Sequence, residues 1–382
     1  MENFVAYNPT KLHFGKNVTD NLGKVIKEFG NRVLLVYGGG SIKNNGIYDK
    51  MISQLKSIDA RVFEYQGIKP NPVYEDVDAA AKLGRDNNVD VILAVGGGSV
   101  IDSAKIISIT IPVENSSWDF YEGKAEPKNA IPLISVLTLA ATGTEMNPFA
   151  VLQNNKTKQK LGWGNKLLYN KHSFLDPQFT YSVPRNQTAY GIVDLIAHSL
   201  EAYFGAGEAT LSDRFIFSII KEAIEYGPKL LDNPDNYELR AKIMYAATTA
   251  LNGLTFLGRK SGDWGVHSIG HVLSLLYDVP HGASLSIAYP AWLKFQKNNI
   301  PERIAELGKN IFNVETPDEI IIAFESFFKS IECPLKLSEI GIGKDKKQKI
   351  FDVMISNNVD GMNYKLNPED YEKIIDLMLS PL

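Results

Sequence analysis

Short apolar runs alternate with amphipathic stretches through the first half of the chain. Four runs have strand-like composition, at residues 32–37, 61–65, 89–95 and 131–137. Helical spacing lies between them, near residues 47–57, 74–87 and 99–109. Strand and helix alternating at this spacing predict a mainly parallel sheet that is covered by helices on both faces. A turn at Asn154 and Asn155, between apolar runs 148–152 and 159–163, predicts an additional hairpin.

The pattern changes after Pro184, where strand candidates nearly vanish. Helical spacing or helix-forming composition covers residues 186–204, 209–227, 239–257, 263–277 and 283–296. We therefore predict an α/β domain over residues 1–184 and an all-helical domain over residues 185–382.

Composition narrows the class of protein. The 382 residues allow two or three domains at ~150 residues each. The net charge of −4 shows no excess of basic residues that would indicate a nucleic-acid surface. One cysteine, Cys333, excludes a disulfide within the chain. The first residues lack a signal-peptide pattern, and no run approaches the ~18 apolar residues of a membrane span. We expect a cytoplasmic globular protein without a nucleic-acid or membrane partner.

Two predicted strands end in Gly-Gly-Gly-Ser, at residues 38–41 and 96–99. Consecutive glycines before a helix expose backbone N–H groups which, with the helix dipole, form an anion site. A single turn of this kind is equally compatible with a tight βα turn without a ligand. Two such turns at the ends of neighbouring strands favour a dinucleotide, because ligands bind at that edge of open α/β sheets.

The first glycine turn also bears on cofactor choice. NAD-selective sites often place an acidic side chain after an early strand, where it bonds the ribose 2′-hydroxyl. Here Gly38, Gly39 and Gly40 occupy that position, with Ser41 and Lys43 close by. The space and the donors suit a 2′-phosphate, so we predict that NADP(H) is favoured over NAD(H). The alternative is NAD, held with less selectivity.

The second half carries a spaced set of possible metal ligands. Asp194 and His198 lie at i, i+4, as do His267 and His271, and His281 follows shortly after. On helices, residues at this spacing project from one face. One carboxylate and several imidazoles suit one divalent ion, Fe²⁺ or Zn²⁺. The spacing leaves open whether His267 and His271 both bind, or whether one of them faces the substrate instead.

These motifs together resemble one protein family. The segments DLIAH (194–198) and VHSIGHVLSLLYDVPHG (266–282) are similar to the metal site of the iron-containing, or group III, alcohol dehydrogenases. The segments AVGGGSVID (94–102) and LTLAATGTE (137–145) resemble that family's cofactor motifs. YGGGSIKNNG (37–46) and KPNP (69–72) most resemble the butanol dehydrogenase branch. The resemblance spans roughly residues 5–375 and implies a dinucleotide-binding α/β domain followed by a helical metal-binding domain, with the active site in the cleft between them.

The resemblance also implies roles for individual residues. The metal ligands would be Asp194, His198, His267 and His281, and His271 would be a non-liganding histidine near the substrate. The cofactor would be bound by Gly38, Gly39, Gly40, Ser41, Asn71, Gly97, Gly98, Ser99, Asp102, Thr138, Thr142 and Lys160. Many relatives carry an acidic residue where Gly39 stands here.

The implied activity is metal-dependent, NAD(P)(H)-linked interconversion of short-chain primary alcohols and aldehydes, such as butanol and butyraldehyde. The alternatives are a glycerol dehydrogenase-like polyol oxidoreductase, and a metallohydrolase or lyase using the same metal site. His271 is the candidate proton relay. Phe149, Leu254 and Trp264 are candidates for the substrate wall, and ordinary core packing explains them equally well. Members of the family are usually dimers or larger, so we expect a homodimer or a higher homo-oligomer.

Overall fold

The computed structural model describes residues 1–380, which form two compact units. One unit is Tyr7–Val183. The other begins at Pro184 and also contains Met1–Ala6. Within this second unit, the backbone N–H of Glu2 donates to the carbonyl of Gly258 at 2.9 Å. The division into folding domains at residues 184 and 185 stays a prediction, since packing units need not fold independently.

The first unit is built on a six-stranded sheet in the order β1-β8-β5-β4-β2-β3, with every neighbouring pair parallel. The fold class predicted above, a parallel α/β unit followed by a helical one, is confirmed. The strands are β1 (Lys11–Phe14), β2 (Arg32–Tyr37), β3 (Arg61–Gln66), β4 (Val91–Gly96), β5 (Leu133–Leu137) and β8 (His172–Leu175).

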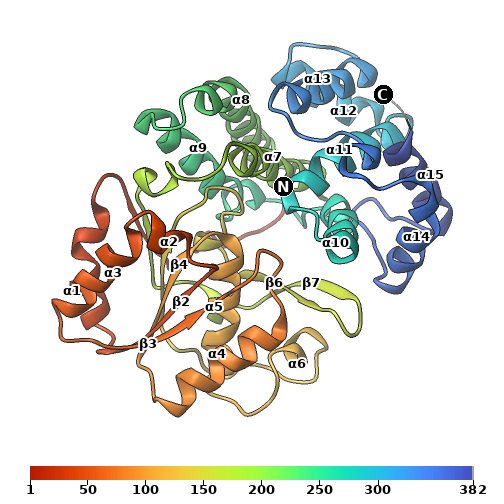
Figure 1. Cartoon of the computed structure of the whole chain (residues 1–382). Helices are drawn as coiled ribbons and strands as arrows, with labels where there is room; N and C mark the ends of the chain where they lie inside the picture. The colour runs from red at the N-terminus through yellow and green to blue at the C-terminus, as the bar shows by residue number, and fades with distance from the viewer. Residues whose placement is uncertain (381–382) are drawn as a thin grey trace. The chain divides into compact units, whose positions relative to one another are not determined.

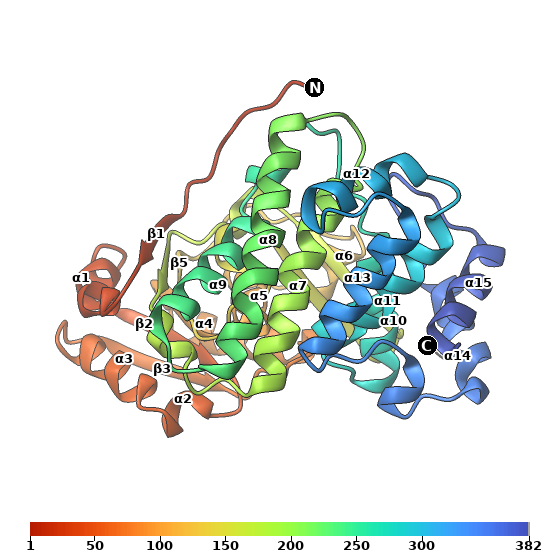
Figure 2. The ribbon, with the colours of Figure 1, turned by 90° about the horizontal axis from the view of Figure 1, so that it is seen from above.

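Helices cover both faces of this sheet, which is why its central strands are apolar on both sides. On one face, α1 and α3 pack against the alternate residues Val33 and Leu35 of β2 and their neighbours on β4. The opposite face carries α4 and α5, which contact each other, and α5 also contacts β4 and β5 (Figures 1 and 2). The helices of this unit are α1 (Leu22–Lys27), α2 (Ser41–Asn44), α3 (Ile47–Lys56), α4 (Tyr74–Asp86), α5 (Gly98–Thr110) and α6 (Trp118–Tyr121).

The strand order places a topological switch point between β2 and β4. The chain passes from β2 outward to β3, and then returns to form β4 on the other side of β2. Crossover connections diverge at such a point and leave a crevice at the carboxyl ends of the strands. Both glycine turns follow these two strands, so they lie at the edge where open α/β sheets generally bind ligands.

The remaining strands of this unit were partly predicted. The hairpin of β6 (Phe149–Asn154) and β7 (Gln159–Gly164) confirms the one predicted around residues 154–155. Strands β1 and β8 were not predicted, since a strand of four residues shows too few positions for an alternating pattern. They extend the sheet on the side of β5.

The second unit is helical around two buried helices. All residues of α7 from Gly191 to Tyr203 are buried, as are nearly all of α11. A helix that is buried all round shows little amphipathic pattern. The helices are α7 (Arg185–Tyr203), α8 (Thr210–Asp232), α9 (Tyr237–Ala250), α10 (Gly265–Tyr277), α11 (His281–Gln296), α12 (Pro301–Ile311), α13 (Pro317–Ser330), α14 (Lys347–Ser356) and α15 (Pro368–Leu379).

One predicted helix was too long. The stretch predicted as helical over residues 239–257 ends at Ala250, and a separate 3₁₀ turn follows at Leu254–Phe256. Gly253 between them has φ +101°, a left-handed conformation that stops an α-helix and that glycine adopts without strain. Among the described residues, we find no helix that combines the length and the apolar character needed to cross a membrane.

Candidate metal centre and cofactor turns

The three predicted histidine ligands surround one carboxylate oxygen of the fourth predicted ligand, Asp194, in the helical unit. The Oδ1 atom of Asp194 lies 3.6 Å from Nδ1 of His198, 3.7 Å from Nε2 of His267 and 3.6 Å from Nε2 of His281. The ligand atoms of Asp194, His267 and His281 all lie within 4.8 Å of one another, which makes them a possible metal site among the described residues. Helices α7, α10 and α11 each contribute to this group.

These separations are too long for hydrogen bonds and suit ligands that share an ion. Two atoms that each bind an ion at ~2.1 Å with tetrahedral angles lie about 3.4 Å apart. Within the described part of the chain, Oδ1 of Asp194, Nδ1 of His198 and Nε2 of His267 are buried and have no hydrogen-bond partner. Buried polar atoms normally find a partner. The donor set therefore fits a divalent cation.

Electrostatics in this cluster favours an ionised aspartate. Burial alone raises the pKa of Asp194, but the surrounding histidines outweigh burial and hold it below its ordinary value. Burial lowers the pKa of His198 to about 4, against the attraction of Asp194. A carboxylate beside a neutral imidazole is the protonation state that binds a metal.

The histidines differ in how they face the aspartate. The ring of His198 stacks on that of His267, with centroids 4.7 Å apart. His198 turns Nδ1 toward Asp194, whereas His267 and His281 turn Nε2 toward it. His271 lies one turn beyond His267 on α10, with its ring 5.5 Å from that of His281. The liganding roles of Asp194, His198, His267 and His281 and the relay role of His271 stay predictions.

Sequence reasoning missed one acidic residue of this cluster. Glu201 of α7 is 1% exposed, and its Oε1 lies 2.8 Å from Nδ1 of His267. It follows His198 by three residues on the same helix, so the spacing gave a signal for a shared face. Nothing in that spacing shows that the face meets α10.

In the α/β unit, the second glycine turn requires its glycines. A Cβ on Gly96 would lie 2.6 Å from Val100, and one on Gly98 would lie 2.6 Å from Thr142. Both distances are shorter than real Cβ contacts. The turn therefore has a bare backbone at the start of α5, where an anion would be stabilised. Ser99 does not cap the helix, since its hydroxyl donates to the carbonyl of Pro70.

Behind this turn, a buried ionic group links α5 to the hairpin and to the predicted nicotinamide segment. Asp102 accepts from the hydroxyl of Thr144 at 2.6 Å and from the N–H of Val151 at 2.9 Å. The ammonium of Lys105 donates to the same hydroxyl at 2.7 Å. Burial lowers the pKa of Lys105 to about 8, although Asp102 opposes the shift. Asp102 thus braces the loop after β5 rather than contacting the glycines.

The other predicted cofactor residues lie in the same unit. Nζ of Lys160 on β7 donates to Oδ1 of Asn71 at 2.7 Å, and both side chains are buried. Thr138 donates its N–H to the carbonyl of Gly96 at 3.0 Å, next to the second glycine turn. The cofactor role of each residue stays a prediction.

The first glycine turn is open. A Cβ on Gly39 would meet nothing within 4 Å, and Gly40 has φ +114° before α2 begins at Ser41. Nζ of Lys43 donates to Gln66 at 3.2 Å and lies 5.2 Å from the ring centroid of Tyr37. The two turns approach each other, since a Cβ on Gly38 would lie 3.8 Å from Val100.

The comparisons with known proteins cover both units. Residues 9–177 match the sequence profile of iron-containing alcohol dehydrogenase, and residues 188–379 match that of the Fe-containing alcohol dehydrogenase family, C-terminal. The chain belongs to the iron-containing alcohol dehydrogenase family. The probable NADH-dependent butanol dehydrogenase 1 of Bacillus subtilis is 40% identical, over 99% of this chain and all of that protein.

Other members of this family are also similar over most of their length. The NADPH-dependent aldehyde reductase YqhD of Escherichia coli is 38% identical over 90% of both chains. The crystal structure of NADH-dependent butanol dehydrogenase A from Thermotoga maritima matches with a TM-score of 0.96 and 40% identity, covering 100% of this chain and 99% of that one. A metallohydrolase or lyase is not favoured, because the family match includes the glycine turns as well as the metal motif.

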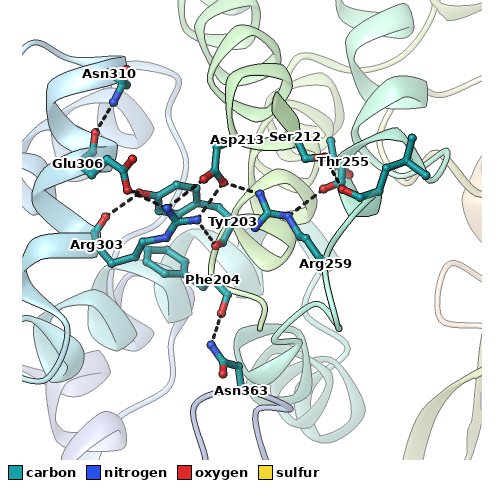
Figure 3. Close-up of polar contacts among 11 residues, drawn as sticks. Tyr203, Phe204, Ser212, Asp213, Thr255, Arg259, Arg303, Glu306, Asn310 and Asn363 are labelled. Atoms are coloured by element: carbon teal, nitrogen blue, oxygen red, sulfur yellow. Dashed lines mark hydrogen bonds and ion pairs between the residues drawn. The ribbon is translucent and has the colours of Figure 1, made fainter. Parts of the chain in front are cut away.

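A second buried polar cluster in the helical unit surrounds Asp213 (Figure 3). Its Oδ1 accepts from Arg303 at 2.9 Å and also from Arg259, and its Oδ2 accepts from Arg303 at 3.1 Å. Arg303 further donates to the carbonyl of Tyr203 at 2.8 Å and lies 3.5 Å from the centroid of that ring. Both carboxylate oxygens are thus hydrogen-bonded, which indicates a structural role.

Proposed function

We propose that this chain reduces short straight-chain aldehydes, such as butyraldehyde, to primary alcohols with NAD(P)H, and catalyses the reverse oxidation. As a member of its family it is an NAD(P)H-dependent alcohol dehydrogenase or aldehyde reductase. The observation that carries the proposal is the buried Oδ1 of Asp194, with three imidazole nitrogens at 3.6–3.7 Å and no hydrogen-bond partner among the described residues.

Asp194, His198, His267 and His281 would hold the ion, and the donor set suits both Fe²⁺ and Zn²⁺. When bound, such an ion polarises the oxygen of the substrate as a Lewis acid. The protein holds Asp194 ionised and excludes water from it, since this residue is 2% exposed. A charged ligand in a water-poor site interacts more strongly with its partner than it would in solution.

The α/β unit would hold the dinucleotide. Backbone N–H groups of Gly97, Gly98 and Ser99 at the start of α5 would bind the pyrophosphate. Thr138 and Thr142 would contact the nicotinamide half, on a loop that Asp102 and Lys105 brace through Thr144. Holding the cofactor in one orientation lowers the entropy cost of hydride transfer.

His271 would supply the proton that the product alcohol needs. Its side chain is half-buried, so it can exchange protons with water, and a histidine titrates near neutral pH. Trp264, whose ring meets that of His267 edge-on at 5.5 Å, and Leu254 would form the apolar wall in this unit. Phe149, which is 49% exposed, would contribute from the α/β unit.

We also propose that NADPH is the better cofactor. The open space at Gly39 and the ammonium of Lys43 support room and charge for a 2′-phosphate. Some relatives are named NADH-dependent and others NADPH-dependent, so the cofactor preference of this chain is to be measured directly. The variant Gly39→Asp places a carboxylate there without a clash, since a Cβ meets nothing within 4 Å.

The direct test of the activity follows NADPH absorbance with butyraldehyde. Turnover that stops with a chelator and returns with Fe²⁺ or Zn²⁺ would support the proposal. A metal-loaded sample that turns over neither short aldehydes nor short alcohols would refute it.

The test of cofactor preference compares KM for NADPH and NADH. Gly39→Asp should raise KM for NADPH by at least about tenfold, because the carboxylate repels the 2′-phosphate, and should leave KM for NADH within about threefold. A wild-type enzyme that strongly prefers NADH would overturn this reading of Gly39.

Finally, we propose that the enzyme works in the cytoplasm as a homodimer or higher homo-oligomer. The single cysteine, Cys333, is buried and free, which suits a reducing compartment. Phe4 and Val5 near the N-terminus are exposed, at 51% and 88%, and are available for contact with a second copy. Light scattering coupled to size-exclusion chromatography would give the number of copies.

A further inference from the structure

A carboxylate that is not a candidate metal ligand lies against the metal site. Glu201 lies two turns after Asp194 on α7 and is 1% exposed. Its Oε1 accepts from the backbone N–H of His267 at 3.0 Å and pairs with Nδ1 of the same residue at 2.8 Å. Its Oε2 accepts from the backbone N–H of Trp264 at 2.5 Å. This one side chain therefore holds both the ring and the backbone of His267.

The contact with Nδ1 decides which nitrogen of His267 is available. An ionised carboxylate only accepts hydrogen bonds, so Nδ1 of His267 carries the proton. In the neutral ring that binds a metal, the lone pair then lies on Nε2, which faces Oδ1 of Asp194 at 3.7 Å. Partners of this kind orient metal-binding histidines and raise their basicity.

The contact with Trp264 holds the start of α10. Trp264 has φ +67°, a left-handed conformation that is strained for a bulky aromatic residue. A second carboxylate, Asp263, supports the same helix start, since its Oδ2 accepts from the N–H of Gly265 at 3.3 Å. Oδ1 of Asp263 accepts from the N–H groups of Asn363 and Tyr364 at 3.0 and 2.7 Å. Of these two carboxylates at the start of α10, Glu201 is the one hydrogen-bonded to His267.

We propose that Glu201 is a positioning residue for the metal site. It fixes the ring orientation and the Nδ1–H tautomer of His267, so that Nε2 is presented to the ion shared with Asp194 and His281. This inference rests on the proposed metal site. It goes beyond helix capping, because the ring contact is separate from the backbone contacts that hold α10.

The experiment measures metal affinity in Glu201→Gln, with Asp263→Asn as the matched control. The glutamine has one acceptor and one donor group. If its oxygen faces His267, its NH₂ group opposes the N–H of Trp264. If it is flipped, its NH₂ group faces Nδ1 and moves the ring proton to Nε2. The first arrangement keeps the proton on Nδ1 but replaces a charged acceptor with a weaker neutral one. The second removes the lone pair from Nε2. Asp263→Asn perturbs the same helix start without touching the histidine.

Purified full-length variants are loaded with Co²⁺ or Zn²⁺ and titrated with a competing chelator. We expect Glu201→Gln to lose about 10- to 100-fold in metal affinity, and Asp263→Asn to stay within about threefold. Binding of NADPH, followed by its fluorescence, should stay within about twofold in both variants. An affinity within twofold of wild type in Glu201→Gln would overturn the proposal, as would an equal loss in Asp263→Asn.

Two further measurements keep the outcome decisive. If Glu201→Gln fails to fold, Glu201→Asp is measured instead, and its shorter side chain should still weaken metal affinity by at least about fivefold. In the Zn²⁺-loaded wild-type protein, nitrogen-detected NMR of ¹⁵N-histidine should show a protonated Nδ1 on His267, and an unprotonated Nδ1 would refute the assignment. A wild-type protein that binds no divalent ion would instead overturn the proposed function.

Discussion

Asp194 and Asp213 are both nearly fully buried in the helical unit, and cationic or titratable side chains surround both. The partners of Asp213 are two arginines within hydrogen-bond distance, at 3.1 Å or less. The partners of Asp194 are three histidines at 3.6–3.7 Å, beyond that distance. Arginines stay charged and satisfy both carboxylate oxygens of Asp213 by themselves. The histidine nitrogens lie beyond hydrogen-bond distance of Oδ1 of Asp194, and the same distances become favourable around an ion.

The comparison teaches that burial of an aspartate does not identify its role. What separates the two clusters is whether the surrounding donors already satisfy the carboxylate. A satisfied cluster stabilises the fold, whereas an unsatisfied one costs free energy until a ligand binds. The binding free energy of the ligand can offset this unfavourable contribution to stability.

The largest expected effect is on activity in Asp194→Asn. Removing the charged ligand should lower kcat/KM for butyraldehyde by about 10³-fold or more, because a Lewis acid contributes several kcal/mol to such a reaction. Metal content after dialysis should fall in parallel. The matched variant Asp213→Asn should keep its metal content. Full activity in Asp194→Asn would remove the distinction between the two clusters.

The next largest effect is on the free energy of unfolding of the variant Asp213→Ala. This substitution leaves Arg259 and Arg303 without their shared counter-ion, and the side chain of Arg259 is fully buried. Breaking a buried ion pair from one side costs about 3–5 kcal/mol. Urea unfolding of the metal-free protein measures this loss. Asp194→Ala should cost less than Asp213→Ala under the same conditions, because Oδ1 of Asp194 has no hydrogen-bond partner among the described residues. Equal losses would contradict the comparison.

The smallest expected effect concerns a pair of histidines in the α/β unit, which differs from both aspartate clusters. Nε2 of His13 and Nδ1 of His172 lie 2.9 Å apart, with one nitrogen donating and the other accepting. Burial, followed by neighbouring positive charge, lowers the pKa of both rings below 6.5. The folded protein thus binds fewer protons than the unfolded chain. The pair's contribution to stability is present above pH 6.5 and is lost as the pH falls below it.

Replacing one partner should flatten that pH dependence. In His13→Gln, the fall in melting temperature between pH 7 and pH 5 should be smaller than in wild type, because one titrating group is gone. The change in stability at pH 7 should be of the order of one hydrogen bond, about 1 kcal/mol. An unchanged pH profile would show that the pair does not titrate in this range.

The parts of the molecule that could be predicted are those whose residue pattern lies within one short segment of the chain. The apolar runs that became β2 and β4 end in glycines, and the i, i+4 pairs at Asp194 and His198 and at His267 and His271 lie on helices as predicted. These features could be predicted because the spacing of residues along the chain determines which face of a helix or strand each side chain occupies.

The features that sequence reasoning missed depend on contacts between distant segments. The short strands β1 and β8 exist because each pairs with a neighbour, with Lys11 opposite His172 in the register. Glu201 is an ordinary buried helical residue until α10 packs against α7 and places His267 on its carboxylate.

The amino-acid sequence by itself determined the parallel α/β and helical organisation, the two glycine turns and the candidate metal ligands. Only the tertiary structure decided which nitrogen of each histidine faces Asp194 and that Glu201 orients His267. It also decided that Asp102 braces a loop instead of the glycines. The physical reason is that spacing within one element fixes a direction, whereas the distance between atoms on different helices is set by how those helices pack.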